Sequence, residues 1–213
     1  MTGSSRLEGF RRSSIFPAFL LGCFALIAGA ALSGGNYLTR DAILARQAED
    51  LRASITQVVP ADLYTNNLLQ DTVTISNPSG EEFLVYRARL DKTPTAFVFQ
   101  VSEPGYGGEI RIIIGIATDG TLLGVRVLAH TETPGLGDKI EAEKDSWILG
   151  FKGLSLGNPA ANLWLVKKDG GVFDQFSGAT ITPRAVVKAV KKGLALFAAN
   201  REFLLAPETE TEK

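Results

Sequence analysis

The residues best placed to do chemistry in this sequence lie just before its last predicted helix, in a segment of small and hydroxyl-bearing side chains. The segment runs Asp174, Gln175, Phe176, Ser177, Gly178, Ala179, Thr180, Ile181, Thr182, Pro183. Gly178 and Ala179 let another molecule approach the backbone closely, and Thr180 offers a hydroxyl group beside them. The first turn of a helix has unpaired N–H groups and the positive end of the helix dipole, which favour an anion such as a phosphate.

An ordinary structural interpretation accounts for the same residues. Thr182 would be the N-cap of the helix, Pro183 its first helical residue and Gly178 a turn glycine. Ser, Thr and Gly are common before helices in general. The residue types alone therefore leave both a phosphate site and a plain helix start open.

A second group of polar residues follows a predicted strand. It reads His130, Thr131, Glu132, Thr133, Pro134, Gly135, Leu136, Gly137. Taken alone, a Pro-Gly pair after a hairpin is usually only a turn, a lone histidine is more often structural than catalytic, and Glu132 can be a solvated carboxylate. The loop Tyr106-Gly107-Gly108 is equally compatible with an ordinary glycine-rich connection.

The composition excludes several classes of function. The 22 basic residues nearly balance the 23 acidic ones, and no basic cluster is interleaved with aromatic residues, so no nucleic-acid partner is expected. The single cysteine, Cys23, lies in an apolar run, which leaves no thiol elsewhere for a disulfide, an iron–sulfur cluster or a Cys-ligated zinc ion. His130 is the only histidine, so we expect no metal site, although binding by carboxylates alone stays open. Redox chemistry here would need an organic cofactor.

The elements that must position these residues begin with a membrane anchor. Residues Ile15 to Leu32 are uncharged, and as a helix they span roughly 27 Å, close to the hydrocarbon thickness of a bilayer. We predict an N-terminal segment over 1–14 and a single transmembrane helix over 15–35. The charged residues before the run are Arg6, Glu8, Arg11 and Arg12. This basic excess places the N-terminus in the cytoplasm and the rest of the chain on the periplasmic side of an inner membrane.

Two other interpretations use the same residues. Ala28-Gly29-Ala30 resembles a signal-peptidase site, although the apolar run is longer than a usual signal-peptide core. Leu20-Leu21-Gly22-Cys23 loosely resembles a lipoprotein signal, although a bulky leucine precedes Gly22. We predict an uncleaved anchor, with a cleaved signal as the main alternative.

The remaining chain predicts an α+β domain. An amphipathic helix over 43–58 and a connection fill 36–80, the domain occupies 81–206, and 207–213 is a solvated tail. Strands rich in Val, Ile and Phe are predicted over Glu82–Leu90, Ala96–Val101, Ile110–Ala117, Leu122–Ala129 and Leu163–Lys168. Asp119-Gly120 predicts a hairpin turn, Asp138–Leu149 a short helix, and a last helix begins after Thr182. Antiparallel strands with peripheral helices give the α+β class.

The segment Ser177-Gly178-Ala179-Thr180 resembles the flavinylation motif of the FMN-binding domain that occurs in two kinds of membrane complex: in the C subunit of the sodium-translocating NADH:quinone reductase and in the G subunit of the Rnf complex. The resemblance implies that a flavin transferase attaches FMN through its phosphate to Thr180, with Thr182 as the second threonine of the motif. The next residue is usually Ser in this family, whereas this chain has Pro183, which suits a first helical position. We therefore expect no loss of attachment.

The stretch from His130 to Gly137 resembles the other hallmark loop of the same domain, and Tyr106-Gly107-Gly108 also looks like a loop of the family. The resemblance implies that these loops line the flavin, through the residues Tyr106, His130, Glu132, Thr133, Pro134, Gly135 and Leu136 together with Ser177, Gly178, Ala179 and Thr182. Order and spacing match from the anchor to the last helix. The short stretch between anchor and hairpin is closer to the Rnf protein.

The resemblance implies an electron-transfer subunit of an Rnf-type ion-translocating ferredoxin:NAD oxidoreductase, with covalent FMN and no independent catalysis. Its partners would be other membrane subunits, membrane lipid and, during maturation, a Mg²⁺-dependent flavin transferase that recognises Asp174. Two alternatives stay open: a C-type subunit of the quinone reductase, and a membrane-tethered flavin-binding sensory module outside an energy-coupling chain.

The predicted orientation has a direct test. A reporter enzyme that works only in the cytoplasm, fused after Lys213, should be inactive, because the basic residues before the apolar run hold the N-terminus inside. The same reporter fused before Met1 is the control and should be active. Activity of the C-terminal fusion would show that the orientation is reversed.

Overall fold

The computed structural model describes residues 15–77 and 79–206. The chain divides into two units, Met1–Glu49 and Asp50–Lys213, of which the second holds the sheet and the last helix. The predicted N-terminal segment 1–14 and the tail 207–213 lie outside the described residues.

Helix α2 (Ile15–Val58) is continuous over both the predicted membrane helix and the predicted amphipathic helix. Pro17 lies in its first turn, where a missing N–H group removes no intrahelical hydrogen bond. Among the described residues, α2 is the one helix long and apolar enough to cross a membrane, and no side chain of its most apolar stretch is buried in the protein. An apolar helix without protein around it has the composition of a segment that lipid surrounds.

The sheet of the second unit is an antiparallel meander of five strands in sequence order. The strands are β1 (Thr72–Ser76), β2 (Glu82–Leu90), β3 (Thr93–Pro104), β4 (Glu109–Ala117) and β5 (Leu122–Ala129). The predicted hairpin between β4 and β5 is confirmed: Gly120 has φ +92°, and the Asp119 carboxylate accepts from the Thr121 N–H at 2.8 Å. Strand β1 was not predicted, because its alternation extends over only two inward residues, Val73 and Ile75.

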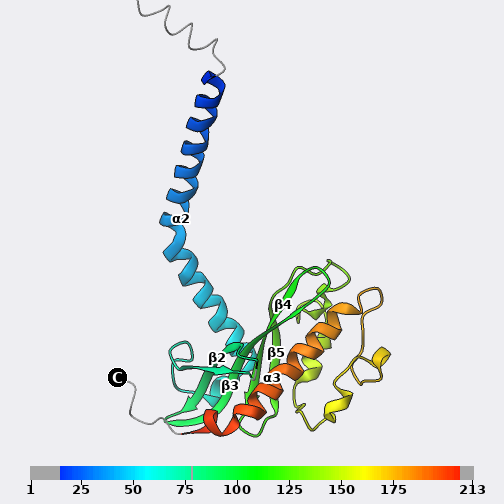
Figure 1. Cartoon of the computed structure of the whole chain (residues 1–213). Coiled ribbons are helices and arrows are strands. Elements are labelled where there is room, and N and C mark those ends of the chain that lie inside the picture. Colours follow the sequence, from blue (N-terminus) through cyan, green and yellow to red (C-terminus); the bar gives the residue numbers. More distant parts are fainter. Residues whose placement is uncertain (1–14, 78, 207–213) are drawn as a thin grey trace, which may run out of the picture. The chain divides into compact units, whose positions relative to one another are not determined.

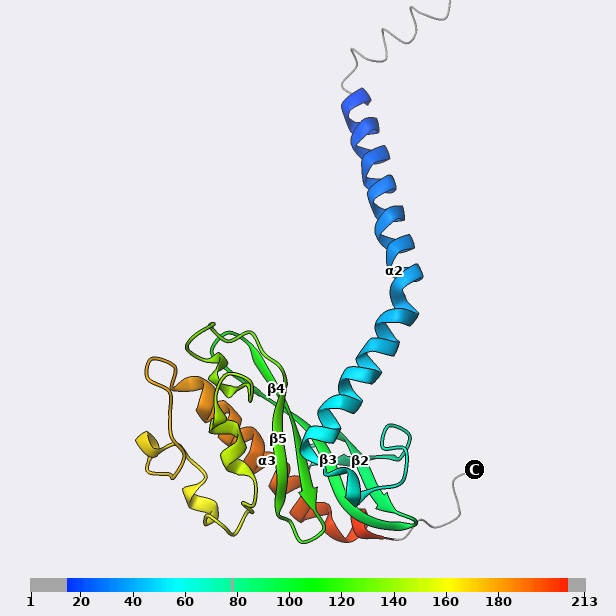
Figure 2. The same ribbon diagram turned by 180° about the vertical axis from the view of Figure 1, so that it is seen from behind.

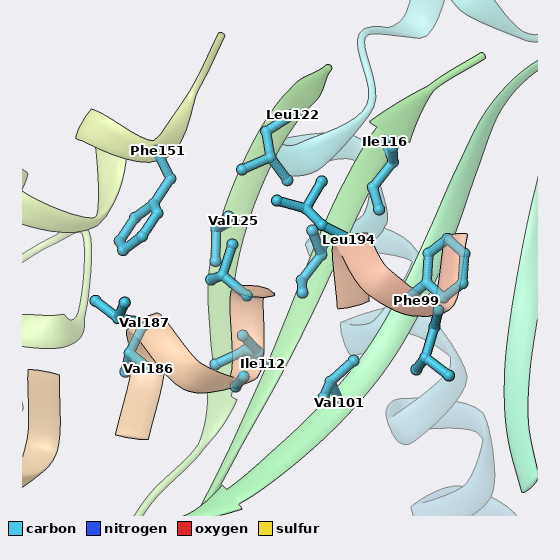
Figure 3. Packing of buried hydrophobic residues seen from close by; sticks show 14 of the residues in the cluster. Phe99, Val101, Ile112, Ile116, Leu122, Val125, Phe151, Val186, Val187 and Leu194 are labelled. Atoms are coloured by element: carbon cyan, nitrogen blue, oxygen red, sulfur yellow. The ribbon is translucent and has the colours of Figure 1, made fainter. Parts of the chain in front are cut away.

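One face of the sheet is covered by helix α3 (Ile181–Leu205), drawn in orange and red in Figure 1. Its predicted apolar stripe is confirmed, because Val186, Val190 and Leu194 are all buried. In Figure 3, Val186, Val187 and Leu194 lie against side chains of β3, β4 and β5. This contact fixes the start of α3 relative to the ends of the strands.

The other face is covered by the last turn of α2 and the segment after it (Figure 2). Ile55 and Val58 are buried against this side of the sheet. The α2 backbone approaches the paired residues Gly115 and Gly124 closely, and a Cβ atom on Gly115 would lie 2.3 Å from the Val58 carbonyl oxygen. Because both faces are covered, the middle of β3 (96–99) and of β4 (112–116) is a run of buried residues rather than an alternating pattern.

Three sequence-based predictions for the second unit need correction. Asp138–Leu149 is not one helix but two 3₁₀ helices, η2 (Asp138–Ile140) and η3 (Ser146–Phe151), because Asp145 accepts from the Trp147 N–H and starts a new turn. Leu163–Lys168 is not a strand. It runs from the end of η4 (Ala161–Leu163) to the start of η5 (Lys167–Asp169), and within it only Val166 forms a β-bridge, with Phe173. Helix α3 begins at Ile181, two residues earlier than predicted.

The close contact at Gly115 makes a prediction about stability. Gly115→Ala should lower the free energy of unfolding by about 2–3 kcal/mol, because the added methyl group meets the Val58 carbonyl and must push the helix end off the sheet. Gly150→Ala is the matched control, since nothing lies within 4 Å of its added Cβ. Denaturant unfolding followed by tryptophan fluorescence measures both, and equal stabilities would show that the helix end does not rest on Gly115.

Candidate functional site

Thr180 follows a tight turn and directly precedes α3. The turn is closed by the Ala179 N–H, which donates to the Phe176 carbonyl at 3.2 Å, and Gly178 adopts φ +79° within it. Ser177 and Gly178 form the exposed tip, whereas Ala179 and Thr180 are half-buried. A residue with positive φ at the third position of such a turn is normally glycine. The turn therefore places the half-buried Thr180 one residue before the helix.

The first turn of α3 is partly exposed, because Ile181 faces solvent whereas Thr182 and Pro183 are buried. Thr180 occupies the N-cap position, and no side chain in the described part of the chain caps the first turn. The interpretation of Thr182 as the N-cap is wrong, because Thr182 is buried and its hydroxyl donates to the Glu132 carboxylate. Pro183 has no N–H group, so the donors of this turn are the N–H groups of Ile181 and Thr182, which together with the helix dipole favour an anion at this end. This donor set suits the phosphate of a flavin nucleotide attached at Thr180.

The Glu132 carboxylate holds three segments together. It is 5 % exposed, and its Oε1 atom accepts from the N–H groups of Tyr106 at 3.0 Å and Gly107 at 2.9 Å. Its Oε2 atom accepts from Thr182. The loop after β3, the loop after β5 and the start of α3 are thus joined through one side chain.

Two glycines make this junction possible. A Cβ atom on Gly107 would lie 2.0 Å from the Thr131 carbonyl oxygen. On Gly137 it would lie 2.9 Å from both the Glu132 Cβ and the Thr182 hydroxyl oxygen. Side chains at either position would force the three segments apart.

His130 fixes the loop from the other side. Its Nδ1 atom accepts from the Glu132 N–H at 3.0 Å, so its proton is on Nε2, which lies 2.7 Å from Glu141 Oε1. Hydrogen bonds from Lys144 and from His130 lower the pKa of Glu141. The imidazole therefore connects the loop to a charged cluster and is half-buried beside it.

The turn after Glu132 is held by a second carboxylate. Asp138 is buried, its pKa is lowered by a hydrogen bond from the Gly135 backbone and then by one from Lys144, and the Lys144 Nζ lies 2.9 Å from Asp138 Oδ2. Thr133, Pro134, Gly135 and Leu136 remain exposed on the outside of this turn. The loop thus has a fixed base and a solvent-facing tip.

The exposed side of the junction carries apolar side chains. Tyr106 is 72 %, Leu136 43 % and Ile181 45 % exposed. The turn and the loop are neighbours, since a Cβ atom on Gly178 would lie 3.7 Å from Leu136 Cδ2. Leu136 and Ile181 therefore offer exposed apolar contacts near the start of α3, against which a flat aromatic ring joined to a phosphate can pack.

Asp174 lies at the outer end of the segment. Its carboxylate is exposed and pairs with Lys167 Nζ at 2.6 Å, and its carbonyl accepts from Trp147 Nε1 at 3.0 Å. The Trp147 ring also packs edge-on against Phe176, with centroids 5.2 Å apart. Sequence reasoning missed that Trp147, Asp138 and Lys144 support the site. The one sequence feature that could have indicated this role is Trp147, a tryptophan that follows a charged and polar stretch.

The junction predicts a large effect of Glu132 substitution on stability. Glu132→Ala should lower the free energy of unfolding by about 3 kcal/mol, because it removes the acceptor of the Tyr106 and Gly107 N–H groups and leaves the buried Thr182 hydroxyl without a partner. Glu132→Gln should cost about 1 kcal/mol, since its carbonyl oxygen can still accept from the backbone.

Thr133→Ala, in the exposed part of the same loop, is the control for this experiment. Denaturant unfolding followed by tryptophan fluorescence measures all three variants. If Glu132→Ala were as stable as Thr133→Ala, the carboxylate would not hold the loops together.

Comparisons with known proteins identify the family of this chain. Residues 105–195 match the FMN-binding domain family. The G subunit of the ion-translocating oxidoreductase complex of Cereibacter sphaeroides is 50 % identical over 198 residues, covering 93 % of this chain and 90 % of that protein. The corresponding G subunit of Pseudomonas aeruginosa is 47 % identical over 203 residues, covering 93 % and 95 %. Among solved structures, Shewanella oneidensis NqrC is 23 % identical with a TM-score of 0.45, covering 68 % and 73 %. By its identity to the two relatives over nearly its whole length, the chain belongs to the family of G subunits of ion-translocating oxidoreductase complexes and carries an FMN-binding domain.

Proposed function

We propose that this protein is an electron-transfer subunit of a membrane-bound ion-translocating oxidoreductase complex of the Rnf type, and that it carries FMN in a phosphoester bond to Thr180. The observation that carries the proposal is the half-exposed Thr180 at the uncapped start of α3, beside an exposed apolar surface. The names of the relatives and the FMN-binding domain support the wider role.

The Thr180 hydroxyl is the nucleophile in the attachment. Its oxygen forms a bond to the phosphorus of a flavin nucleotide, its proton passes to a base of the transferase, and the leaving group of the donor departs from phosphorus. The phosphodiester that results is singly charged. The helix dipole and the N–H groups of Ile181 and Thr182 would stabilise this charge without a basic side chain.

The protein's own residues then hold and shield the ring. Leu136, Ile181 and Tyr106 offer apolar surface, while Glu132 and His130 keep the loops that carry them in place. Thr133, Pro134 and Gly135 form the rim, with Ser177, Gly178 and Ala179 on the side of the bond. When bound, flavin accepts one or two electrons, so the protein needs no catalytic acid or base of its own.

The site is exposed enough for other proteins to reach it. Its tip residues are exposed, so a redox centre in a neighbouring membrane subunit can approach the ring. Asp174 is exposed in the same segment as Thr180, six residues earlier, where a Mg²⁺-dependent transferase can recognise its carboxylate. We place the FMN-binding domain, residues 81–206, on the periplasmic side of the inner membrane, with residues 15–35 of α2 in contact with lipid.

The bond itself is tested by Thr180→Ala. The variant should lose all covalent FMN and keep its fold, because the hydroxyl is the acceptor and the half-buried methyl group contributes little to the core. Mass spectrometry of the peptide from Asp174 to Arg184, after production with a flavin transferase, measures the bond, and in-gel flavin fluorescence confirms it.

Ser177→Ala is the matched control, since it removes an exposed hydroxyl from the same turn and should keep most of the flavin. Thr180→Ser should retain part of the flavin, because it keeps a hydroxyl at the acceptor position. A flavin mass on another residue, or fluorescence in denatured Thr180→Ala protein, would contradict the assignment.

A further inference from the structure

An ion pair outside the loops described so far joins the first turn of α3 to η5. The Arg184 guanidinium donates from Nε to Asp169 Oδ2 at 2.5 Å and from Nη2 to Asp169 Oδ1 at 2.6 Å. Two parallel hydrogen bonds of this kind fix direction as well as distance. The bond from Arg184 lowers the pKa of Asp169, so the carboxylate stays charged at neutral pH.

Asp169 stands on backbone that is held independently of the pair. The loop that carries Asp169 is closed by the Lys167 N–H, which donates to the Phe173 carbonyl at 2.7 Å, and by the Gly171 N–H, which donates to the Val166 carbonyl at 3.1 Å. The side chains of Val166 and Phe173 are buried. Surface pairs between two mobile side chains contribute little, but here one partner, Asp169, leaves a fixed loop to which the pair can hold the start of α3.

The two paired residues flank the acceptor segment in the sequence. Arg184 lies four residues after Thr180, on the same side of the helix, and its N–H donates to the Thr180 carbonyl at 3.4 Å. The chain from Asp169 to Arg184 contains the whole exposed turn. Trp147 holds the same segment at Asp174, on the far side of that turn.

We propose that Arg184 and Asp169 form a positioning pair, which holds the start of α3 so that the Thr180 hydroxyl faces the flavin transferase. This inference rests on the proposed attachment at Thr180. The pair is not a phosphate-binding site, because Asp169 occupies two donors of the guanidinium and nearly cancels its charge. The pair acts by fixing the position of the backbone, so an ion pair with the acidic and basic residues exchanged between positions 169 and 184 should serve equally well.

The test measures the rate of covalent flavin labelling of the full-length chain by flavin transferase, as in-gel fluorescence against time. Arg184→Asp and Asp169→Arg should each label about three- to tenfold more slowly, in keeping with couplings between contacting residues. The double variant Asp169→Arg/Arg184→Asp should return to within about twofold of the wild-type rate, because it restores an ion pair.

Two further variants make the result interpretable. Glu81→Lys reverses one charge of another ion pair on α3, Lys192 with Glu81 at 3.1 Å, and should label at the wild-type rate. If the charge reversals fail to fold, Arg184→Gln and Asp169→Asn remove the pair more gently and should each slow labelling about two- to threefold.

Three results separate the possibilities. Normal rates in all variants of the pair would overturn the positioning role and leave the attachment site intact. A folded double variant as slow as Arg184→Asp would show that Arg184 is needed for its own charge, and would also overturn it. Wild-type protein without covalent flavin on Thr180 would contradict the proposed function itself.

Discussion

The buried Glu132 carboxylate is the interaction on which the site depends. A carboxylate away from water must have its oxygens hydrogen-bonded, and here the donors come from the loop after β3 and from the first turn of α3. These segments are far apart in sequence and meet at this carboxylate, so a shift of any one of them leaves the buried charge with fewer hydrogen-bond donors. The packing of α3 on the sheet determines where the helix lies, and the Glu132 hydrogen bonds determine how its first turn and the two loops are placed relative to one another.

Around this buried centre, the elements that hold the site and those that meet a ligand are distinct. The loop after β5 is fixed by His130 and Asp138. Helix α3 is fixed by an ion pair between Lys188 and Glu103 at 2.6 Å. The residues proposed to meet the ligand, in 133–136 and 177–181, are small, apolar or exposed, and the first turn of α3 has no side-chain cap among the described residues. A rigid base with an uncommitted surface can bind a large flat cofactor without reorganising, which limits the entropy lost on binding.

The sequence predicted those parts of the fold that depend on local patterns. The β2 strand, the β4–β5 hairpin and the apolar stripe of α3 follow from residue periodicity and from Asp119-Gly120. It failed where backbone bonds are irregular: Leu163–Lys168 has apolar residues like a strand, yet its hydrogen bonds go to a short turn closed by Gly170 at φ +86°. The role of Thr182 was missed for another reason. Its partner Glu132 is 50 residues away, so a threonine before a helix could only be interpreted as a cap.

The most direct measurement of this account is an experimental electron-density map of the full chain after flavin attachment. We predict continuous density from the Thr180 hydroxyl oxygen to the FMN phosphorus, with the ring lying on the side of Leu136 and Tyr106 and with Glu132 still bonded to Tyr106, Gly107 and Thr182. Flavin density bonded to another residue, or a ring away from both loops while Glu132 keeps its three partners, would contradict the account.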